Sequence, residues 1–156
     1  MLRVSILMVG RTKEPFLRQG VEFFRRRLAP YLHLTLVEVR AEREVKGLTP
    51  ELIKSREGER LLARVPERAY LTALDPKGRE CTTEDFAHWL GRREAEARPL
   101  AFVVGGHLGL APQVFSRAEE TLALSRLTFS HELARLVLLE QLYRAMTLKA
   151  GHPYHV

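Results

Sequence analysis

The chain has 156 residues, of which 46% are apolar, and a net charge of +6 with a pI near 9.9. This length suits one domain, residues 1–156, and the apolar fraction is high enough for a globular core and too high for a disordered protein. Apolar runs such as residues 136–139 are far too short to cross a bilayer, and the N-terminus lacks the long apolar stretch of a signal peptide. A single cysteine, Cys81, excludes an internal disulfide and a cysteine-based zinc site. These features predict a cytoplasmic protein.

Strand-like and helix-like segments alternate along the chain. Five apolar, partly β-branched runs predict strands at Leu2–Val9, Leu32–Val39, Ala69–Leu74, Leu100–Val104 and Leu122–Thr128. Helices are expected to begin at Pro15, at Pro50 behind a Thr49 cap, after Thr82 or Thr83, at Pro112, and at about Ser130, the last running to Thr147. This alternation predicts an α/β fold with a mostly parallel sheet and flanking helices.

The basic excess lies entirely in the first half of the chain. Residues 1–68 contain 15 Lys or Arg and 9 Asp or Glu, whereas residues 69–156 contain 10 of each. A basic N-terminal half is typical of a protein that meets a polyanion such as RNA. A merely soluble surface is the alternative.

The last predicted helix is apolar around most of its circumference. Only five side chains, those of Glu132, Arg135, Glu140, Gln141 and Arg144, interrupt the apolar surface between residues 132 and 146. Such a helix needs cover on two sides, and its own sheet provides one, so a second subunit is the natural second cover. The alternative is a helix enclosed within the monomer.

Three predicted strands end in segments suited to ligand binding. These are residues 74–78, the glycine loop that begins at Gly105-Gly106, and residues 125–130. In open α/β sheets, ligands bind beyond the carboxyl ends of the strands. The glycine loop matches neither a dinucleotide-binding fingerprint nor a P-loop, and on its own it is as consistent with a structural turn as with a ligand site.

The C-terminal residues, which include His152, Tyr154 and His155, have the composition of an acid–base site. A solvated tail is the alternative. No cluster of carboxylates accompanies the two histidines, so no metal site is predicted. Glu140 and Arg144 lie four residues apart on the last predicted helix, where they form either an ordinary i,i+4 pair or part of a site near this tail.

Two blocks of sequence resemble the RlmH (YbeA) family of SPOUT-class rRNA methyltransferases. The first is the glycine loop, G-G-x-x-G-L at residues 105–110. The second is L-S-R-L-T-F-S-H at residues 124–131, followed by E-Q-L-Y-R-A at residues 140–145 and by Tyr154-His155. The resemblance extends over the whole chain.

The resemblance implies a C-terminal trefoil knot, a homodimer, and S-adenosylmethionine bound in the knot loops. By matching position, the implied cofactor-binding residues are Leu74, Gly106, Ser125, Arg126, Leu127, Thr128, Phe129 and Ser130. The sequence departs from the family pattern at His107, where a proline or small residue is usual, and at Ser130, where proline is usual. Both departures concern the stiffness of the loops.

The implied reaction is methylation at N3 of a pseudouridine in large-subunit (23S) ribosomal RNA, on the assembled ribosome. That nitrogen carries a proton, so a base and an anion-stabilising group are needed. His155 is expected to accept the proton, Arg144 to stabilise the anionic oxygens, and Tyr154 to orient the base. No metal and no membrane are implied. The alternatives are a SPOUT enzyme that acts on transfer RNA and an RNA-binding protein without activity.

Overall fold

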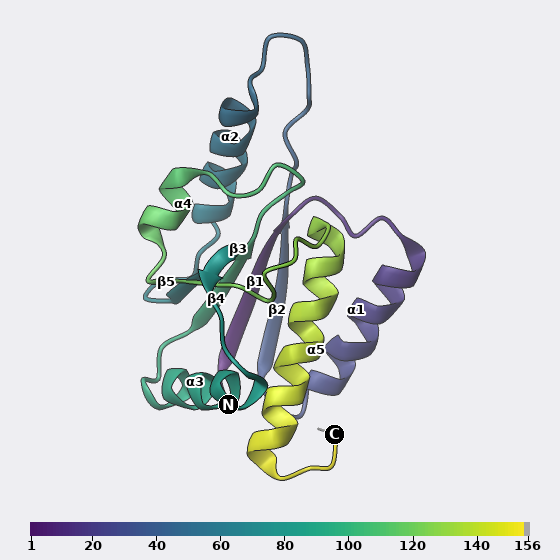
Figure 1. Cartoon of the computed structure of the whole chain (residues 1–156), viewed down its shortest axis with the longest axis vertical. Helices are drawn as coiled ribbons and strands as arrows, with labels where there is room; N and C mark the ends of the chain where they lie inside the picture. Colours follow the sequence, from purple (N-terminus) through teal and green to yellow (C-terminus); the bar gives the residue numbers. More distant parts are fainter. Residues whose placement is uncertain (155–156) are drawn as a thin grey trace.

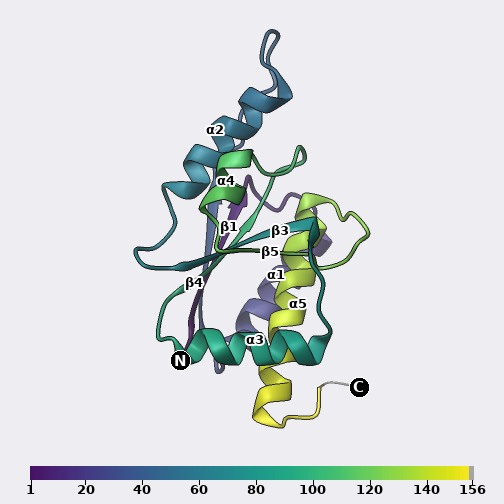
Figure 2. The same ribbon diagram turned by 60° about the vertical axis from the view of Figure 1, so that its left-hand side comes forward.

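The computed structural model describes residues 1–154 as a parallel sheet with helices on both faces (Figures 1 and 2). Within this range the strands are β1 (Arg3–Val9), β2 (His33–Val39), β3 (Tyr70–Arg79), β4 (Leu100–Val104) and β5 (Glu120–Leu122). The helices are α1 (Pro15–Leu28), α2 (Pro50–Leu62), α3 (Thr83–Ala95), α4 (Pro112–Arg117) and α5 (His131–Ala150). The strand order is β2-β1-β4-β3-β5, and each of the neighbouring pairs is parallel. The predicted α/β fold is confirmed.

Alternating side chains of β1 build a core on each face of the sheet. Val4, Ile6 and Met8 lie in a cluster with α1, α3 and α5, whereas Leu7 and Val9 lie in a second cluster with α2 and α4. The strands are therefore apolar on both sides, as a sheet covered by helices on two faces requires. Figure 2 shows α2 and α4 on one side of the sheet and the other three helices on the opposite side.

Side-chain caps fix where the helices begin. Thr49, Thr82 and Ser130 each accept a hydrogen bond from the backbone N–H three residues further on, which satisfies one unpaired donor of α2, α3 and α5. The helix starts predicted at Pro15, Pro50 and Pro112 are confirmed. Helix α5 continues three residues beyond the predicted end and stops at Gly151, which has a φ of +73° that favours glycine.

The prediction for the last strand is wrong. Strand β5 ends at Leu122, and residues 124–130 form a loop. Hydroxyl groups in this segment hold the backbone in turns, because Ser125 Oγ accepts from Leu127 N at 2.9 Å and Ser130 caps α5. Strand β3 is longer than predicted, since Arg79 pairs with Leu122 after an irregularity that follows Leu74.

Candidate active site

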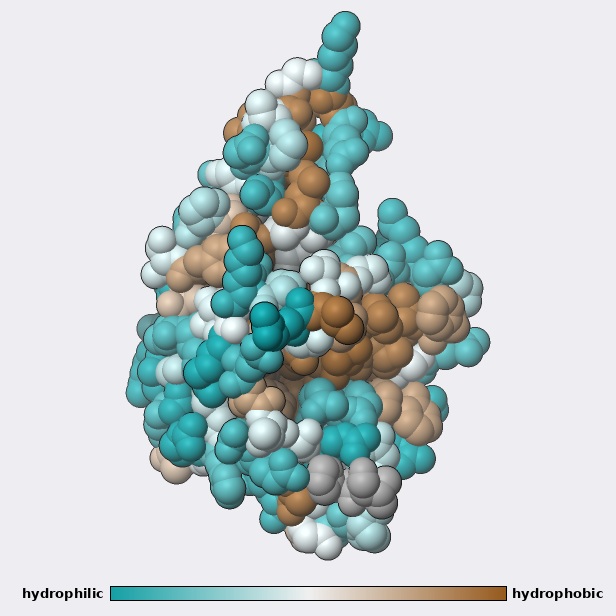
Figure 3. Space-filling view, in the orientation of Figure 1, coloured by the Kyte–Doolittle hydropathy of each residue, from teal (hydrophilic) through white to brown (hydrophobic). Residues whose placement is uncertain are grey.

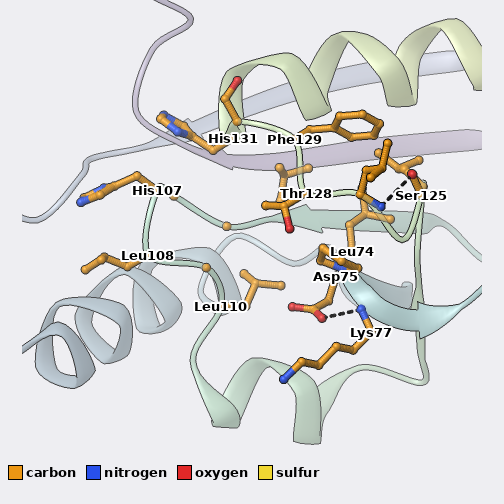
Figure 4. A pocket seen from close by; sticks show the side chains of 18 residues that line it. Leu74, Asp75, Lys77, His107, Leu108, Leu110, Ser125, Thr128, Phe129 and His131 are labelled. Carbon is orange, nitrogen blue, oxygen red and sulfur yellow. Dashed lines mark hydrogen bonds between the residues drawn. The ribbon is translucent and has the colours of Figure 1, made fainter.

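A cleft of about 630 Å³ lies at the carboxyl ends of β3 and β4, with a third wall formed by the loop between β5 and α5 (Figure 4). Among residues 1–154, its lining comes from these three segments, namely residues 74–77, 104–110, and 124–131 without Arg126. A volume of this size suits a small organic ligand. The position agrees with the rule that ligands of open α/β sheets bind beyond the strand ends.

Glycines in the wall after β4 allow a tight turn of the backbone. A Cβ on Gly105 would lie 2.7 Å from the carbonyl carbon of Gly109, which no real side chain tolerates. Gly109 N donates to Gly106 O at 3.0 Å, and Gly109 has a φ of +88°. A Cβ on Gly106 would instead point away from the turn, 3.1 Å from Glu57 Oε1 and 3.3 Å from Val9. The glycine loop is therefore both a structural turn and a wall of the cleft.

Seven of the eight residues expected to bind a cofactor line this cleft. They are Leu74, Gly106, Ser125, Leu127, Thr128, Phe129 and Ser130. Arg126 does not: its side chain is 81% exposed, and its Nε lies 3.7 Å from Glu80 Oε1. The structure thus brings together residues from three distant parts of the chain, and their contact with a ligand stays a prediction.

Four ionisable side chains that are not among the residues implied to bind the cofactor line the cleft as well: Asp75, Lys77, His107 and His131. Burial, and then the charge of Arg135, lower the pKa of His131 below its usual range. His107 Nε2 lies 2.5 Å from Glu44 Oε1, at the outer edge of the cleft. Asp75, Lys77 and His107 fall in segments that the sequence already marked as suited to ligand binding, and His131 is the first residue of α5.

Hydrogen bonds join the first turns of α5 to the end of β1 and the segment that follows it. Glu132 Oε1 accepts from the backbone N–H groups of Lys13 and Glu14, at 2.6 and 3.3 Å. Arg135 is 1% exposed and donates to Val9 O at 2.5 Å and to Thr12 Oγ1 at 3.0 Å. These bonds fix the first turns of α5, and with them the end of the loop that forms the third wall of the cleft.

Two of the three predicted catalytic residues form a cluster near the other end of α5. Glu140 Oε1 accepts from Arg144 at 2.6 Å and from the Tyr154 hydroxyl at 3.4 Å, and the Arg144 guanidinium lies 4.9 Å from the centre of the Tyr154 ring. The hydrogen bond to Glu140 raises the pKa of Arg144, whereas burial and then the charge of Glu140 raise the pKa of Tyr154. His155, the predicted base, lies outside the described residues.

This cluster and the cleft are far apart within one subunit. His131 lines the cleft and Arg144 lies thirteen residues further along α5, a separation of about 20 Å at the rise of an α-helix. The segment that follows α5 folds back onto its own subunit, where Tyr31 Oη lies 2.5 Å from His152 Nδ1 and the Tyr154 ring packs against Tyr143. The described part of this segment, up to Tyr154, therefore packs against its own subunit.

Two further properties concern the described part of the chain. No helix in residues 1–154 has both the length and the apolar character needed to span a membrane. The same residues contain no group of three or more His, Cys, Asp or Glu side chains suited to a metal ion.

The parallel sheet and the three-walled cleft at its carboxyl edge define an α/β protein with a site for a small ligand. The family model described as "Predicted SPOUT methyltransferase" matches residues 2–155, and the chain belongs to this family. Membership makes the protein a methyltransferase, implies a methyl donor, and implies the C-terminal trefoil knot. The resemblance noted in the sequence is thereby confirmed.

Curated relatives match over nearly their whole length. A "Ribosomal RNA large subunit methyltransferase H" of Carboxydothermus hydrogenoformans is 39% identical over 158 residues, with 99% of both chains covered. A "Putative ribosomal RNA large subunit methyltransferase H" of Methanoregula boonei is 45% identical over 159 residues, again with 99% of both chains covered. A third relative of the same kind, from Geobacter metallireducens, is 41% identical over 155 residues at the same coverage.

Proposed function

We propose that the protein transfers a methyl group from S-adenosylmethionine to N3 of a pseudouridine in large-subunit (23S) ribosomal RNA, in the cytoplasm and on the assembled ribosome. The observation that carries this proposal is the cleft, whose three walls come from the segments that the family resemblance assigns to the donor. The names of these relatives support ribosomal RNA as the substrate.

The cleft has the properties that S-adenosylmethionine requires. Leu74, Leu110 and Phe129 offer apolar surface for a nucleobase, and the hydroxyl of Thr128 offers a polar contact (Figure 4). The glycines of the loop after β4 allow the tight backbone turn that shapes this wall of the cleft. When bound, S-adenosylmethionine supplies an activated methyl group on a sulfonium.

The chain's own residues have two tasks in this reaction. The cleft walls orient the donor, and alignment of the methyl group with the attacking nitrogen provides much of the rate enhancement. The proton on N3 must pass to a base, for which we propose His155, while the Arg144 cation stabilises the anionic oxygens and Tyr154 orients the ring. Arg144 suits this task because its bond to Glu140 fixes the guanidinium and keeps it charged.

The separation of about 20 Å between Arg144 and the cleft supports a site shared by two subunits. If two α5 helices pack antiparallel about a twofold axis, the Arg144 end of one helix lies beside the cleft end of the other. Leu133, Val137 and Arg144 are spaced so that they lie on one side of α5. The partner's tail cluster would then complete the site.

Partly exposed apolar side chains on α5 and α1 support this dimer. Leu133 and Val137 are only partly buried, while Phe16 of α1 and Leu127 before α5 are 67% and 74% exposed. We call these four residues the apolar face. Figure 3 shows brown, apolar surface over this part of α5 and the adjoining α1. Exposed apolar area of this kind is typical of a surface that binds another protein.

The proposal is tested by methylation of ribosomes from a strain that lacks the corresponding gene. Purified protein and S-adenosylmethionine should restore one methyl group, found by mass spectrometry of nuclease-digested 23S RNA on a single pseudouridine. Transfer RNA and protein-free 23S RNA, treated in parallel, should gain no methyl group. Methylation of transfer RNA in place of 23S RNA would overturn the substrate assignment.

A further inference from the structure

Asp75 presents a fixed carboxylate to the cleft. It follows the buried part of β3, is itself half-buried, and its Oδ1 accepts a hydrogen bond from Lys77 N at 2.9 Å. This turn holds the side chain in one orientation. In Figure 4 the carboxylate points toward Leu110, into the same space that the Thr128 side chain enters from the opposite wall.

Asp75 is also the one acidic side chain among the described residues that line the cleft. The other ionisable groups of the lining are Lys77, His107 and His131, each of which is positively charged or neutral. Glu44 is paired with His107 at the outer edge and does not line the cleft. The carboxylate of Asp75 is therefore the group in the lining that attracts a cation.

We infer that Asp75 faces the sulfonium of the bound donor and makes the cleft prefer the charged donor over the neutral product. This inference rests on the proposed use of S-adenosylmethionine. Methyl transfer to N3 breaks the bond between sulfur and the methyl carbon and forms a bond between that carbon and nitrogen, while the N3 proton passes to the base. The sulfonium becomes an uncharged thioether, S-adenosylhomocysteine, so the attraction to Asp75 ends with the reaction and the product leaves more readily.

The test is calorimetric titration of the intact protein with three ligands: S-adenosylmethionine, S-adenosylhomocysteine and sinefungin, an analogue with an ammonium group near the position of the sulfonium. The variant is Asp75→Asn, whose side-chain oxygen still accepts from Lys77 N. The control is Glu67→Gln, which removes a negative charge from an exposed residue just before the start of β3. Both variants are first checked for an unchanged circular dichroism spectrum and thermal midpoint.

Asp75→Asn should weaken binding of the two cationic ligands about fivefold to tenfold and leave S-adenosylhomocysteine within twofold, while Glu67→Gln changes none of the three. Equal weakening of all three ligands would overturn the inference, because Asp75 would then hold a group common to donor and product. No weakening at all would overturn it as well.

Wild-type protein provides a second test that does not depend on the variant's folding. Its preference for S-adenosylmethionine over S-adenosylhomocysteine should decline between 50 and 500 mM NaCl, because salt screens a charge interaction in an open cleft. A preference that is absent at low salt would contradict the role of Asp75 while leaving the proposed function intact. Failure of the wild-type protein to bind any of the three ligands would instead contradict the proposed function.

Discussion

At the scale of single residues, two adjacent glycines of the cleft wall have different environments. The space beside Gly105 is filled by the backbone of Gly109 and Leu110, whereas Gly106 faces a carboxylate oxygen of Glu57 that has no hydrogen-bond partner. The family resemblance implies that Gly106 contacts the cofactor, which would place a side chain at residue 106 in the ligand site. The structure shows that it would enter the space between the loop and Glu57, so Gly106→Val would act mainly on the fold.

Gly105→Ala is expected to lower the free energy of unfolding by about 2–3 kcal/mol, because a Cβ 2.7 Å from backbone forces the loop to move. The control is Gly91→Ala on α3, where a Cβ would meet only the Lys149 side chain at 3.8 Å. That change should raise stability by about 0.5–1 kcal/mol. Denaturant unfolding at one fixed protein concentration measures both. A Gly105→Ala protein as stable as wild type would contradict the close approach seen here.

The lowered pKa of His131 makes stability depend on pH. Burial disfavours the charged ring in the folded state, so below the unfolded pKa of about 6.5 the unfolded chain binds more protons than the folded one. The contribution of His131 is present above that pH and is lost as the pH falls. His131→Gln should therefore show a smaller decrease in thermal midpoint between pH 7.5 and 5 than wild type. His88→Gln, an exposed position on α3, should follow the wild-type curve.

At the scale of secondary-structure elements, α1 combines basic and aromatic side chains on its exposed surface. Arg25 and Arg26 are exposed and lie near Glu22. The guanidinium carbon of Arg27 lies 4.4 Å from the centre of the Phe23 ring, on which it stacks. The triple change of Arg25, Arg26 and Arg27 to Ala should weaken RNA binding. It should also reduce the number of counterions released on binding by up to three, which lowers the slope of the logarithm of the binding constant against the logarithm of the salt concentration. S-adenosylmethionine binding should be unchanged. Filter binding at several salt concentrations measures the effect. Arg92→Ala on α3 is the control and should bind RNA as wild type does. An unchanged salt slope for the triple variant would exclude α1 from the RNA-binding surface.

Helix α5 has a buried side and a partly exposed side, and only the second can test the dimer. Leu142, an obvious target from the sequence, is fully buried in the monomer core, so a charge there would unfold the chain. Val137→Glu, on the apolar face, should instead give folded monomers. Sedimentation velocity at micromolar concentration distinguishes these outcomes. A folded wild-type monomer at that concentration would refute the dimer, and Glu84→Gln on α3 should sediment as wild type.

The elements themselves differ in how far the sequence determines them. The periodicity of apolar residues and the positions of proline and threonine predicted four strands and the starts of all five helices closely. These features depend on interactions between residues a few positions apart, which the sequence shows directly. The signal failed at residues 124–130, where apolar side chains looked like a strand. There, local bonds from Ser125 and Ser130 and the need to line a cleft compete with strand pairing, and the apolar residues serve the site.

At the scale of the whole molecule, the contacts that place the site join distant segments, and periodicity contains no information about them. Arg135 looked like an interruption of an apolar helix but is buried against Val9 and Thr12, more than 120 residues away in sequence. The knot is implied by family membership and could not be predicted from general rules, because knots are rare in proteins. The separation of Arg144 from the cleft likewise appears only in three dimensions.

A site shared between subunits predicts that two inactive variants restore activity to each other. Thr128→Trp should fill the cleft and abolish donor binding, whereas Arg144→Ala should bind donor and RNA normally but lower turnover by about a hundredfold. When the two are mixed at equal concentration, unfolded together and refolded, about half of the dimers contain one copy of each variant. In each mixed dimer, one cleft is intact and faces an intact Arg144 from the partner, so activity should return to about a quarter of the wild-type value.

Single-turnover methylation of ribosomes measures this activity, with each variant refolded alone as the control. Activity no greater than the mean of the two separate variants would mean that cleft and tail cluster act within one subunit, and α5 would then have to bend or the tail to move by about 20 Å.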